Sequence, residues 1–188
     1  MEGRDSGRHF GVLAAGLAAG ALGSRLLPPL VAMANGTFRA CRGSDPFEIL
    51  ISDHRMILSV LDKMAEQSEG SNARRASLFL MLKRKLAKHA MAEEDVVYPL
   101  LHGRGHDPDG SKQLYDEHAD MKIMLFELEE LLMSGADWKE PVGRLRELIR
   151  SHIDEEEQVV FPQLRQLIDR GAVPKVSGQI RREEALVL

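Results

Sequence analysis

The chain is short of cysteine, of aromatic residues and of excess positive charge, and each shortage excludes a class of protein. Cys41 is the only cysteine in 188 residues, so neither an intrachain disulfide nor a zinc site built from several thiolates is possible. Aromatic residues make up 5% of the chain, which disfavours β-sandwiches, since these draw on Tyr and Phe. The net charge of −4, with basic residues interspersed among acidic ones, predicts no nucleic-acid partner. Any metal site must therefore use nitrogen and oxygen ligands.

What the chain does contain favours a helical protein with a buried core. Hydrophobic residues make up 44% and charged residues 29%, in a length that suits one domain with additional sequence at its ends. The composition divides the chain into three segments. Residues 1–43 are a hydrophobic segment rich in Gly and Ala, residues 44–170 are charged and periodic, and residues 171–188 are a short mixed tail.

The periodic segment predicts four helices in an all-α, up-down-up-down four-helix bundle, with an extra Gly/Ala-rich helical segment before it. Apolar residues recur at helical spacing, and Gly-rich breaks separate the four stretches. Pro99 and Pro162 fall late in the second and fourth helices, where a proline either ends a helix or kinks it. The expected ranges are Asp45 to about Ser68, about Ala73 to Leu101, Asp109 or Ser111 (as the N-cap) to Ser134, and about Trp138 to Arg170.

Each of the four apolar stripes is interrupted by His or Glu at positions that face the core. The interruptions match between the two halves of the periodic segment, which repeat with an offset of 63 or 64 residues. A single core histidine is usually structural, and a single His-xxx-Glu pair is common on helix surfaces. Chance explains matching core positions in both repeats poorly. The six residues are His54, His89, Glu93, His118, His152 and Glu156.

These residue types at this spacing indicate a centre with two metal ions. His89 and Glu93 are four residues apart and share a helix face, as do their counterparts in the second repeat. The simplest arrangement places His54 and His89 on one ion and the other two histidines on the second, with both glutamates as bridges. No Lys or Arg occupies a stripe position to neutralise the glutamates, whereas two divalent cations would. Imidazole and carboxylate together suit iron, manganese or zinc; we expect two iron ions bridged by carboxylates, with manganese and zinc as alternatives.

Other polar residues near the stripes are expected to have other roles. His102 and His106 lie in a Gly-rich stretch and should be solvated. Tyr98 could donate to a metal-bound ligand, but its counterpart Phe161 in the second repeat cannot, so a packing role is expected. Four charged residues adjoin the candidate ligands and are expected at the surface, with orientation of a ligand as the alternative. They are Asp53, Glu94, Glu117 and Glu157.

The duplicated set resembles the hemerythrin-like (HHE cation-binding) family over about residues 45–170. The resemblance rests on the histidines, the two His-xxx-Glu motifs and the flanking sequences EEDVVYP and EEQVVFP. It implies a four-helix bundle with a non-haem di-iron site that binds oxygen, nitric oxide or peroxide, or senses iron. The oxygen carriers of the family have a fifth histidine where this chain has Lys122. The chain is more similar to the bacterial members with four His and two Glu.

Three functional hypotheses follow. The leading one is a di-iron protein that binds or senses a small diatomic molecule, a reactive oxygen or nitrogen species, or iron. The second is a di-iron oxidoreductase that reduces peroxide or nitric oxide, or an iron donor in the repair of iron centres. The third is a structural bundle without metal, which metal analysis would distinguish.

The N-terminal segment allows several interpretations. Residues 10–24 are uncharged but shorter than the roughly 20 residues that span a bilayer, and Arg25 and two prolines interrupt the continuation to residue 34. Small residues spaced four apart favour a helix that packs on the bundle or on a second copy in a homo-oligomer. Membrane association through residues 10–34 is the alternative, and the signal-peptide features are faint. We expect the protein in the cytoplasm, in solution or attached to a membrane.

Overall fold

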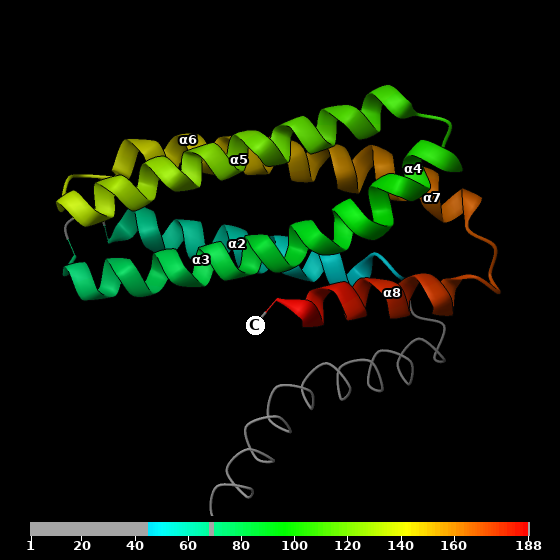
Figure 1. The fold of residues 1–188 in the computed structure, drawn as a ribbon, viewed down its shortest axis with the longest axis horizontal. Helices are drawn as coiled ribbons and strands as arrows, with labels where there is room; N and C mark the ends of the chain where they lie inside the picture. The colour runs from blue at the N-terminus through cyan, green and yellow to red at the C-terminus, as the bar shows by residue number, and fades with distance from the viewer. Residues whose placement is uncertain (1–44, 68–69, 188) are drawn as a thin grey trace, which may run out of the picture.

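The computed structural model describes residues 45–67 and 70–187, and over these ranges it confirms the predicted all-α bundle. Four long helices run alternately up and down (Figure 1). Each helix packs against two others, which closes the bundle: α2 contacts α3 and α6, and α5 contacts α3 and α6. The four helices are α2 (Glu48–Glu66), α3 (Asn72–Ala92), α5 (Pro108–Ser134) and α6 (Lys139–Glu155).

Both prolines late in a helix follow a short π-helical turn. Helix α3 continues through the π-turn η1 (Glu93–Val97) into α4 (Tyr98–Gly103), and α6 continues through η2 (Glu156–Val160) into α7 (Phe161–Leu167). In η1 the Tyr98 N–H donates to the Glu93 carbonyl, five residues back, and Pro99 has no N–H to donate to the next carbonyl. The Glu94 carbonyl accepts a 2.7 Å hydrogen bond from the Tyr115 hydroxyl instead. The helices therefore neither end at the prolines nor stay regular.

Local chemistry accounts for the helix ends. The Asp45 carboxylate accepts from the Phe47 N–H at 3.0 Å just before α2 begins. Helix α5 is capped by Asp107, whose carboxylate accepts from the Gly110 N–H at 2.8 Å. The prediction of Asp109 or Ser111 as its cap was wrong, because Pro108 already occupies the first helical position. Helix α5 ends at Gly135 in the left-handed conformation, with φ of 70°, which glycine adopts without strain.

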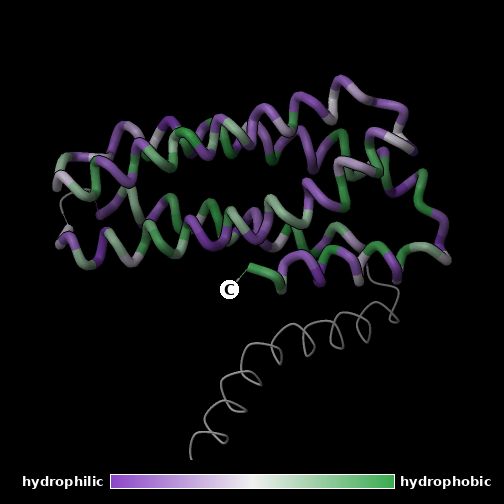
Figure 2. Tube along the Cα trace, in the orientation of Figure 1, coloured by the Kyte–Doolittle hydropathy of each residue, from purple (hydrophilic) through white to green (hydrophobic). Residues whose placement is uncertain are grey.

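The apolar core consists of two clusters, one on either side of the polar residues in the middle of the bundle. Hydrophobic and hydrophilic residues alternate along every helix (Figure 2). Trp138 is fully buried in the cluster at the α5–α6 turn and donates from its indole N–H to the Met64 carbonyl at 3.2 Å. Three residues after Glu156, Val159 continues the apolar stripe of the fourth predicted helix, and the stripe pattern therefore predicts that it lies in the core. It is instead 48% exposed, because η2 alters the helical register and turns Val160 inward.

The C-terminal segment contains a helix that the sequence analysis did not predict. Helix α8 (Val173–Leu186) runs back along the bundle and packs against α3 and η1 (Figure 1). Val176 and Ile180 join the core cluster around Phe47 and Phe161. The Gly/Ala-rich segment of residues 1–43, with the membrane-association prediction for residues 10–34, lies outside the described residues. Among the described helices, none has both the length and the apolar character needed to cross a bilayer.

Candidate metal centre

The structure brings the six predicted residues together in the middle of the bundle. Helices α2 and α5 contribute one histidine each, while α3 and α6 each contribute a histidine whose glutamate partner begins the following π-turn. Glu93 and Glu156 are fully buried, and none of the four histidines is more than 4% exposed. The donor atoms fall into two groups that share Glu93, each compact enough to hold one ion. The groups are His54, His89, Glu93 and Glu156, and Glu93, His118 and His152.

The two buried carboxylates divide their oxygens between the two pairs of histidines. Glu93 Oε1 lies 3.0 Å from His89 Nε2, while Glu93 Oε2 lies 3.5 Å from His118 Nε2. Glu156 Oε2 lies 3.2 Å from His54 Nε2, while Glu156 Oε1 lies 3.5 Å from His152 Nε2. Each carboxylate therefore has one oxygen on either side, which is the arrangement of a bridge between two ions.

The spacing of the donor atoms fits metal coordination better than hydrogen bonding. Ligand atoms about 2.1 Å from one ion, at angles between about 90° and about 109°, are about 3.0 to 3.4 Å apart. The distances within each group cluster around this range. His54 Nε2, both oxygens of Glu93 and Glu156 Oε2 are buried and have no hydrogen-bond partner in the described part of the chain. Buried polar atoms are normally satisfied, so four unsatisfied atoms aimed at one another indicate a ligand set for cations.

Three more glutamates hold the histidines from outside. Glu157 Oε1 lies 2.7 Å from His54 Nδ1, and Glu94 Oε1 lies 2.9 Å from His118 Nδ1. Glu117 Oε2 lies 2.7 Å from the Nδ1 of the α6 histidine. An ionised carboxylate only accepts, so each Nδ1 must donate its proton, and each Nε2 is left to face the centre. Carboxylates that fix histidine ligands in this way are typical of metal sites.

The prediction that these glutamates are free surface charges was therefore wrong. Their side chains are only partly exposed, at 33% for Glu157, 26% for Glu94 and 22% for Glu117. The expectation of a surface position was also wrong for Asp53, which is buried. Its carboxylate lies 3.8 Å from Lys88 Nζ and holds no histidine among the described residues. The Nδ1 atom of His89 has no hydrogen-bond partner among the described residues. Three of the four histidines therefore have a glutamate that fixes the orientation of the ring.

The charges of the metal-free centre balance internally. Burial alone would lower the pKa of His54, but Glu156 and Glu93 outweigh it and raise that pKa to about 10. Burial likewise opposes Glu93 and Glu94 at His118, whose pKa rises to about 9. Burial would raise the pKa of Glu93, but the surrounding histidines, with His89 first, hold it well below its usual range. Protons on the histidines thus occupy the place that cations would take.

Tyr98 also reaches the centre, contrary to its predicted packing role. Its hydroxyl oxygen lies 3.0 Å from His118 Nε2, 3.3 Å from His152 Nε2 and 3.0 Å from Glu156 Oε1. The ring is fully buried. The sequence offers one signal for this role, namely that the counterpart Phe161 lacks the hydroxyl.

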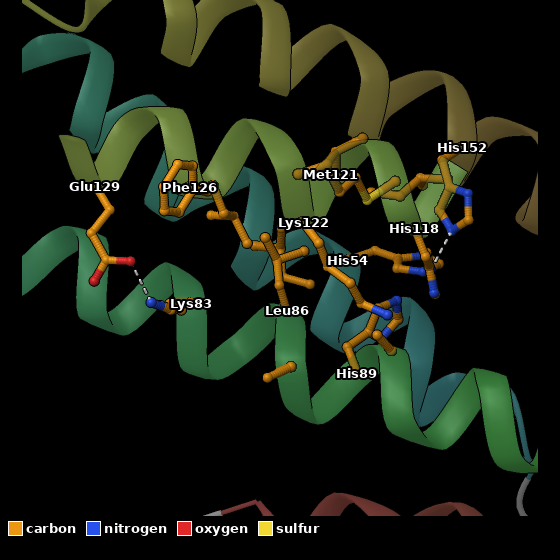
Figure 3. Close-up of a pocket in the computed structure, with 16 residues that line it drawn as sticks. His54, Lys83, Leu86, His89, His118, Met121, Lys122, Phe126, Glu129 and His152 are labelled. Carbon is orange, nitrogen blue, oxygen red and sulfur yellow. Dashed lines mark hydrogen bonds and ion pairs between the residues drawn. The ribbon is translucent and has the colours of Figure 1, made fainter. Parts of the chain in front are cut away.

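An apolar pocket of about 280 Å³ opens beside the centre. All four histidines lie at one end of it, and Phe126, Lys83 and Glu129 lie at the other (Figure 3). Tyr98, Glu93 and Glu156 do not line this pocket. The histidine side of the centre therefore adjoins an apolar cavity.

Lys122 lies beside the pocket. Its ammonium group is 2.9 Å from Glu94 Oε1, the carboxylate that holds His118, and its side chain is 62% exposed. The lysine thus acts on a carboxylate outside the centre, where its positive charge offsets one of the outer glutamates. His102 and His106 are exposed at the far end of α4 and after it, as predicted.

Comparison with known proteins agrees with this geometry. The family model described as Hemerythrin HHE cation binding domain matches residues 45–164. A protein of Nostoc sp. (strain PCC 7120 / SAG 25.82 / UTEX 2576) named DNA nickase is 25% identical over 118 residues, which cover 63% of this chain and 33% of that protein. The chain thus spans about a third of that relative's length. No solved structure matches the chain.

Proposed function

The chain belongs to the hemerythrin HHE cation-binding domain family, and from this membership and the geometry of the centre we propose that it is a di-iron protein that binds a small oxygen or nitrogen species. The proposed ligands are the six residues at the core positions. They are His54, His89, Glu93, His118, His152 and Glu156.

One observation supports two ions rather than one. In each buried carboxylate, one oxygen faces one pair of histidines and the other oxygen faces the other pair. A single ion would leave one oxygen of Glu93 and one of Glu156 facing an imidazole pair with nothing to bind. The charges also agree. Two divalent ions carry four positive charges, against two bridging and three outer glutamates, and Lys122 offsets the fifth carboxylate.

The donor set supports iron over manganese and zinc. Two histidines with a carboxylate and open positions form the arrangement typical of non-haem iron. Structural zinc sites are usually closed by four ligands and favour thiolates, which this centre lacks. Bound iron would supply open positions for a diatomic molecule or peroxide. The protein would orient the histidines through the outer glutamates and admit the small molecule through the apolar pocket.

Metal analysis of purified protein tests this proposal. We expect two iron ions per chain, and a large loss of iron in His89→Ala and in His152→Ala. His102→Ala is the matched control, because that histidine is exposed on α4, away from the centre. Absorption spectra before and after exposure to oxygen, nitric oxide and peroxide should then change in the iron-loaded protein. Wild-type iron content that persists in both ligand variants would contradict the proposed centre.

An oxidoreductase is the second candidate. The pocket of about 280 Å³ is larger than a diatomic molecule needs, so it has room for a peroxide as well. Turnover of peroxide or nitric oxide with an added reductant would support this candidate, whereas a spectral change without turnover would support binding alone. The name of the Nostoc relative concerns a protein three times as long as the matched region, so DNA nicking is not proposed for this chain.

A further inference from the structure

The six proposed ligands supply two histidines to each half of the centre and share the two glutamates between the halves. The buried aromatic residue five positions after each glutamate differs between the halves. Tyr98 places its hydroxyl among the donor atoms of the His118–His152 half. Phe161, its counterpart in the repeat, has no hydroxyl and stacks instead on Phe47, with ring centres 4.8 Å apart, and on His54 at 6.0 Å. The two halves therefore differ by one oxygen atom.

The phenol oxygen lies among three polar atoms of the centre, and its one proton can be donated to only one of them. His118 Nε2, His152 Nε2 and Glu156 Oε1 all lie within 3.3 Å of it. The two Nε2 atoms are themselves 3.2 Å apart. Glu94 and Glu117 hold the two Nδ1 atoms, so once a cation has displaced the Nε2 proton of His118, both imidazoles present a lone pair to the space that the phenol oxygen also faces. A cation satisfies all these atoms at once, whereas a single hydroxyl proton satisfies one of them.

The distances also match coordination to one ion. The phenol oxygen and the two Nε2 atoms form a triangle with sides of 3.0, 3.2 and 3.3 Å. Atoms that bind one ion at about 2.1 Å in adjacent positions have separations of about 3.0 to 3.4 Å. Tyr98 is fully buried, and the ring of Tyr115 packs edge-on against it with ring centres 5.0 Å apart, so protein surrounds the phenol.

We propose that Tyr98 is a seventh ligand of the centre and binds, through its phenolate oxygen, the ion held by His118 and His152. The inference rests on the proposed di-iron function. When the oxygen–metal bond forms, the O–H bond breaks and one proton is released to solvent, so no oxidant or reductant is needed. Because Tyr98 does not line the apolar pocket, its oxygen occupies a position on the closed side of the centre. The two halves would then differ, because the half with His54 and His89 would have one protein ligand fewer and so more room for an incoming molecule.

Spectroscopy of the iron-loaded full-length protein tests this assignment. A phenolate bound to iron(III) gives a visible charge-transfer band, and resonance Raman excitation within that band enhances tyrosinate ring vibrations. The chain has two tyrosines, so Tyr115→Phe is a matched control. We expect the band and the vibrations in wild type and in Tyr115→Phe, and their complete loss in Tyr98→Phe.

Each outcome separates this inference from the proposed function. Wild-type protein with two iron ions but without the phenolate band would overturn the assignment of Tyr98 and leave the di-iron proposal intact. A band lost in Tyr115→Phe but kept in Tyr98→Phe would overturn it as well. Protein that takes up no iron would overturn the proposed function, and the inference with it. If Tyr98→Phe fails to fold, the wild type and the Tyr115→Phe control still assign the band.

Discussion

Glu157 and Glu94 each hold a histidine that belongs to the other half of the chain. Glu157 is the second residue of η2 and accepts a hydrogen bond from His54 on α2. Glu94 is the second residue of η1 and accepts a hydrogen bond from His118 on α5. The hydrogen bond from His118 lowers the pKa of Glu94, which keeps the carboxylate ionised at neutral pH. These side chains determine which imidazole nitrogen is free to bind a metal.

Removal of an outer glutamate should weaken metal binding without unfolding the protein. In Glu157→Ala the His54 ring loses its orienting acceptor, and we expect metal affinity to fall by about 10-fold to 100-fold. Glu155→Ala, an exposed change on α6, is the matched control and should leave affinity unchanged. Competition with a coloured chelator measures both. Equal affinities for the two variants would show that Glu157 has no positioning role.

Six residues of the centre could be predicted from sequence because they interrupt apolar stripes at matching places in a repeat. The outer glutamates could not, because each is one residue away from a stripe position and so has the sequence pattern of a solvated charge. Only the three-dimensional packing of the neighbouring helices makes Glu94 and Glu157 reach across. For Tyr98 the packing role was preferred over donation to a ligand for a related reason. An aromatic residue at a core position usually serves packing, and the sequence does not tell where its hydroxyl points.

Among the secondary-structure elements, the sequence pattern did not predict the two π-turns or helix α8. A π-turn adds a residue without changing the apolar composition, so the stripe appears continuous and Val159 was wrongly placed in the core. The four main helices were predictable because Gly and Pro mark their ends and the apolar repeat fixes their faces. Helix α8 is short and contains Pro174 and Gly178, and its burial depends on the surface of α3.

Helix α8 should contribute measurably to stability. Ile180 is fully buried in the core cluster of α4 and α7, so Ile180→Ala should lower the free energy of unfolding by about 2 to 4 kcal/mol. Leu186→Ala, on the same helix but at a residue that is 53% exposed, should change it by less than about 0.5 kcal/mol. Urea denaturation followed by circular dichroism measures both variants. An unaltered midpoint for Ile180→Ala would mean that α8 does not dock on the bundle in solution.

At the scale of the whole molecule, the balanced charges of the metal-free centre predict how metal binding depends on pH. Metal must displace protons from His54 and His118, whose pKa values are about 10 and about 9 in the metal-free protein. Each displaced proton makes the apparent affinity rise by about tenfold per pH unit. We therefore expect affinity for Zn²⁺ or Mn²⁺ to keep rising well above pH 7. Titrations monitored by calorimetry measure this, and an affinity that levels off near the ordinary histidine pKa of about 6.5 would contradict it.

The same pKa values predict that the stability of the metal-free protein falls as the pH rises, whereas metal affinity increases. A raised histidine pKa stabilises the fold fully below the unfolded value of about 6.5, and this contribution is lost as the pH rises through about 9 and about 10. Metal-free protein should therefore become less stable between neutral and alkaline pH. Thermal unfolding in the presence of a chelator measures the trend, and increasing stability over that interval would contradict the pairing of these histidines with Glu93 and Glu156.

Access to the centre is the second property of the whole molecule. Ala90 lines the apolar pocket between α3 and α5, so Ala90→Phe should fill part of it and slow the arrival of a small molecule by about tenfold, with iron content unchanged. Ala119→Phe, at an exposed position of α5 that does not line the pocket, is the control. Stopped-flow absorption with nitric oxide measures both rates. If both variants react as fast as wild type, the small molecule uses another route.

The crossed contacts of Glu94 and Glu157 have a wider consequence. The two helix pairs carry matching residues, and each gives a carboxylate to a histidine of the other, as the subunits of a two-fold symmetric dimer would. Neither pair can assemble a centre by itself, because each relies on a carboxylate from the other. In a true homodimer every substitution appears twice. Fusion into one polypeptide removes that constraint, and it allows a hydroxyl at Tyr98 in one half while Phe161 lacks it in the other.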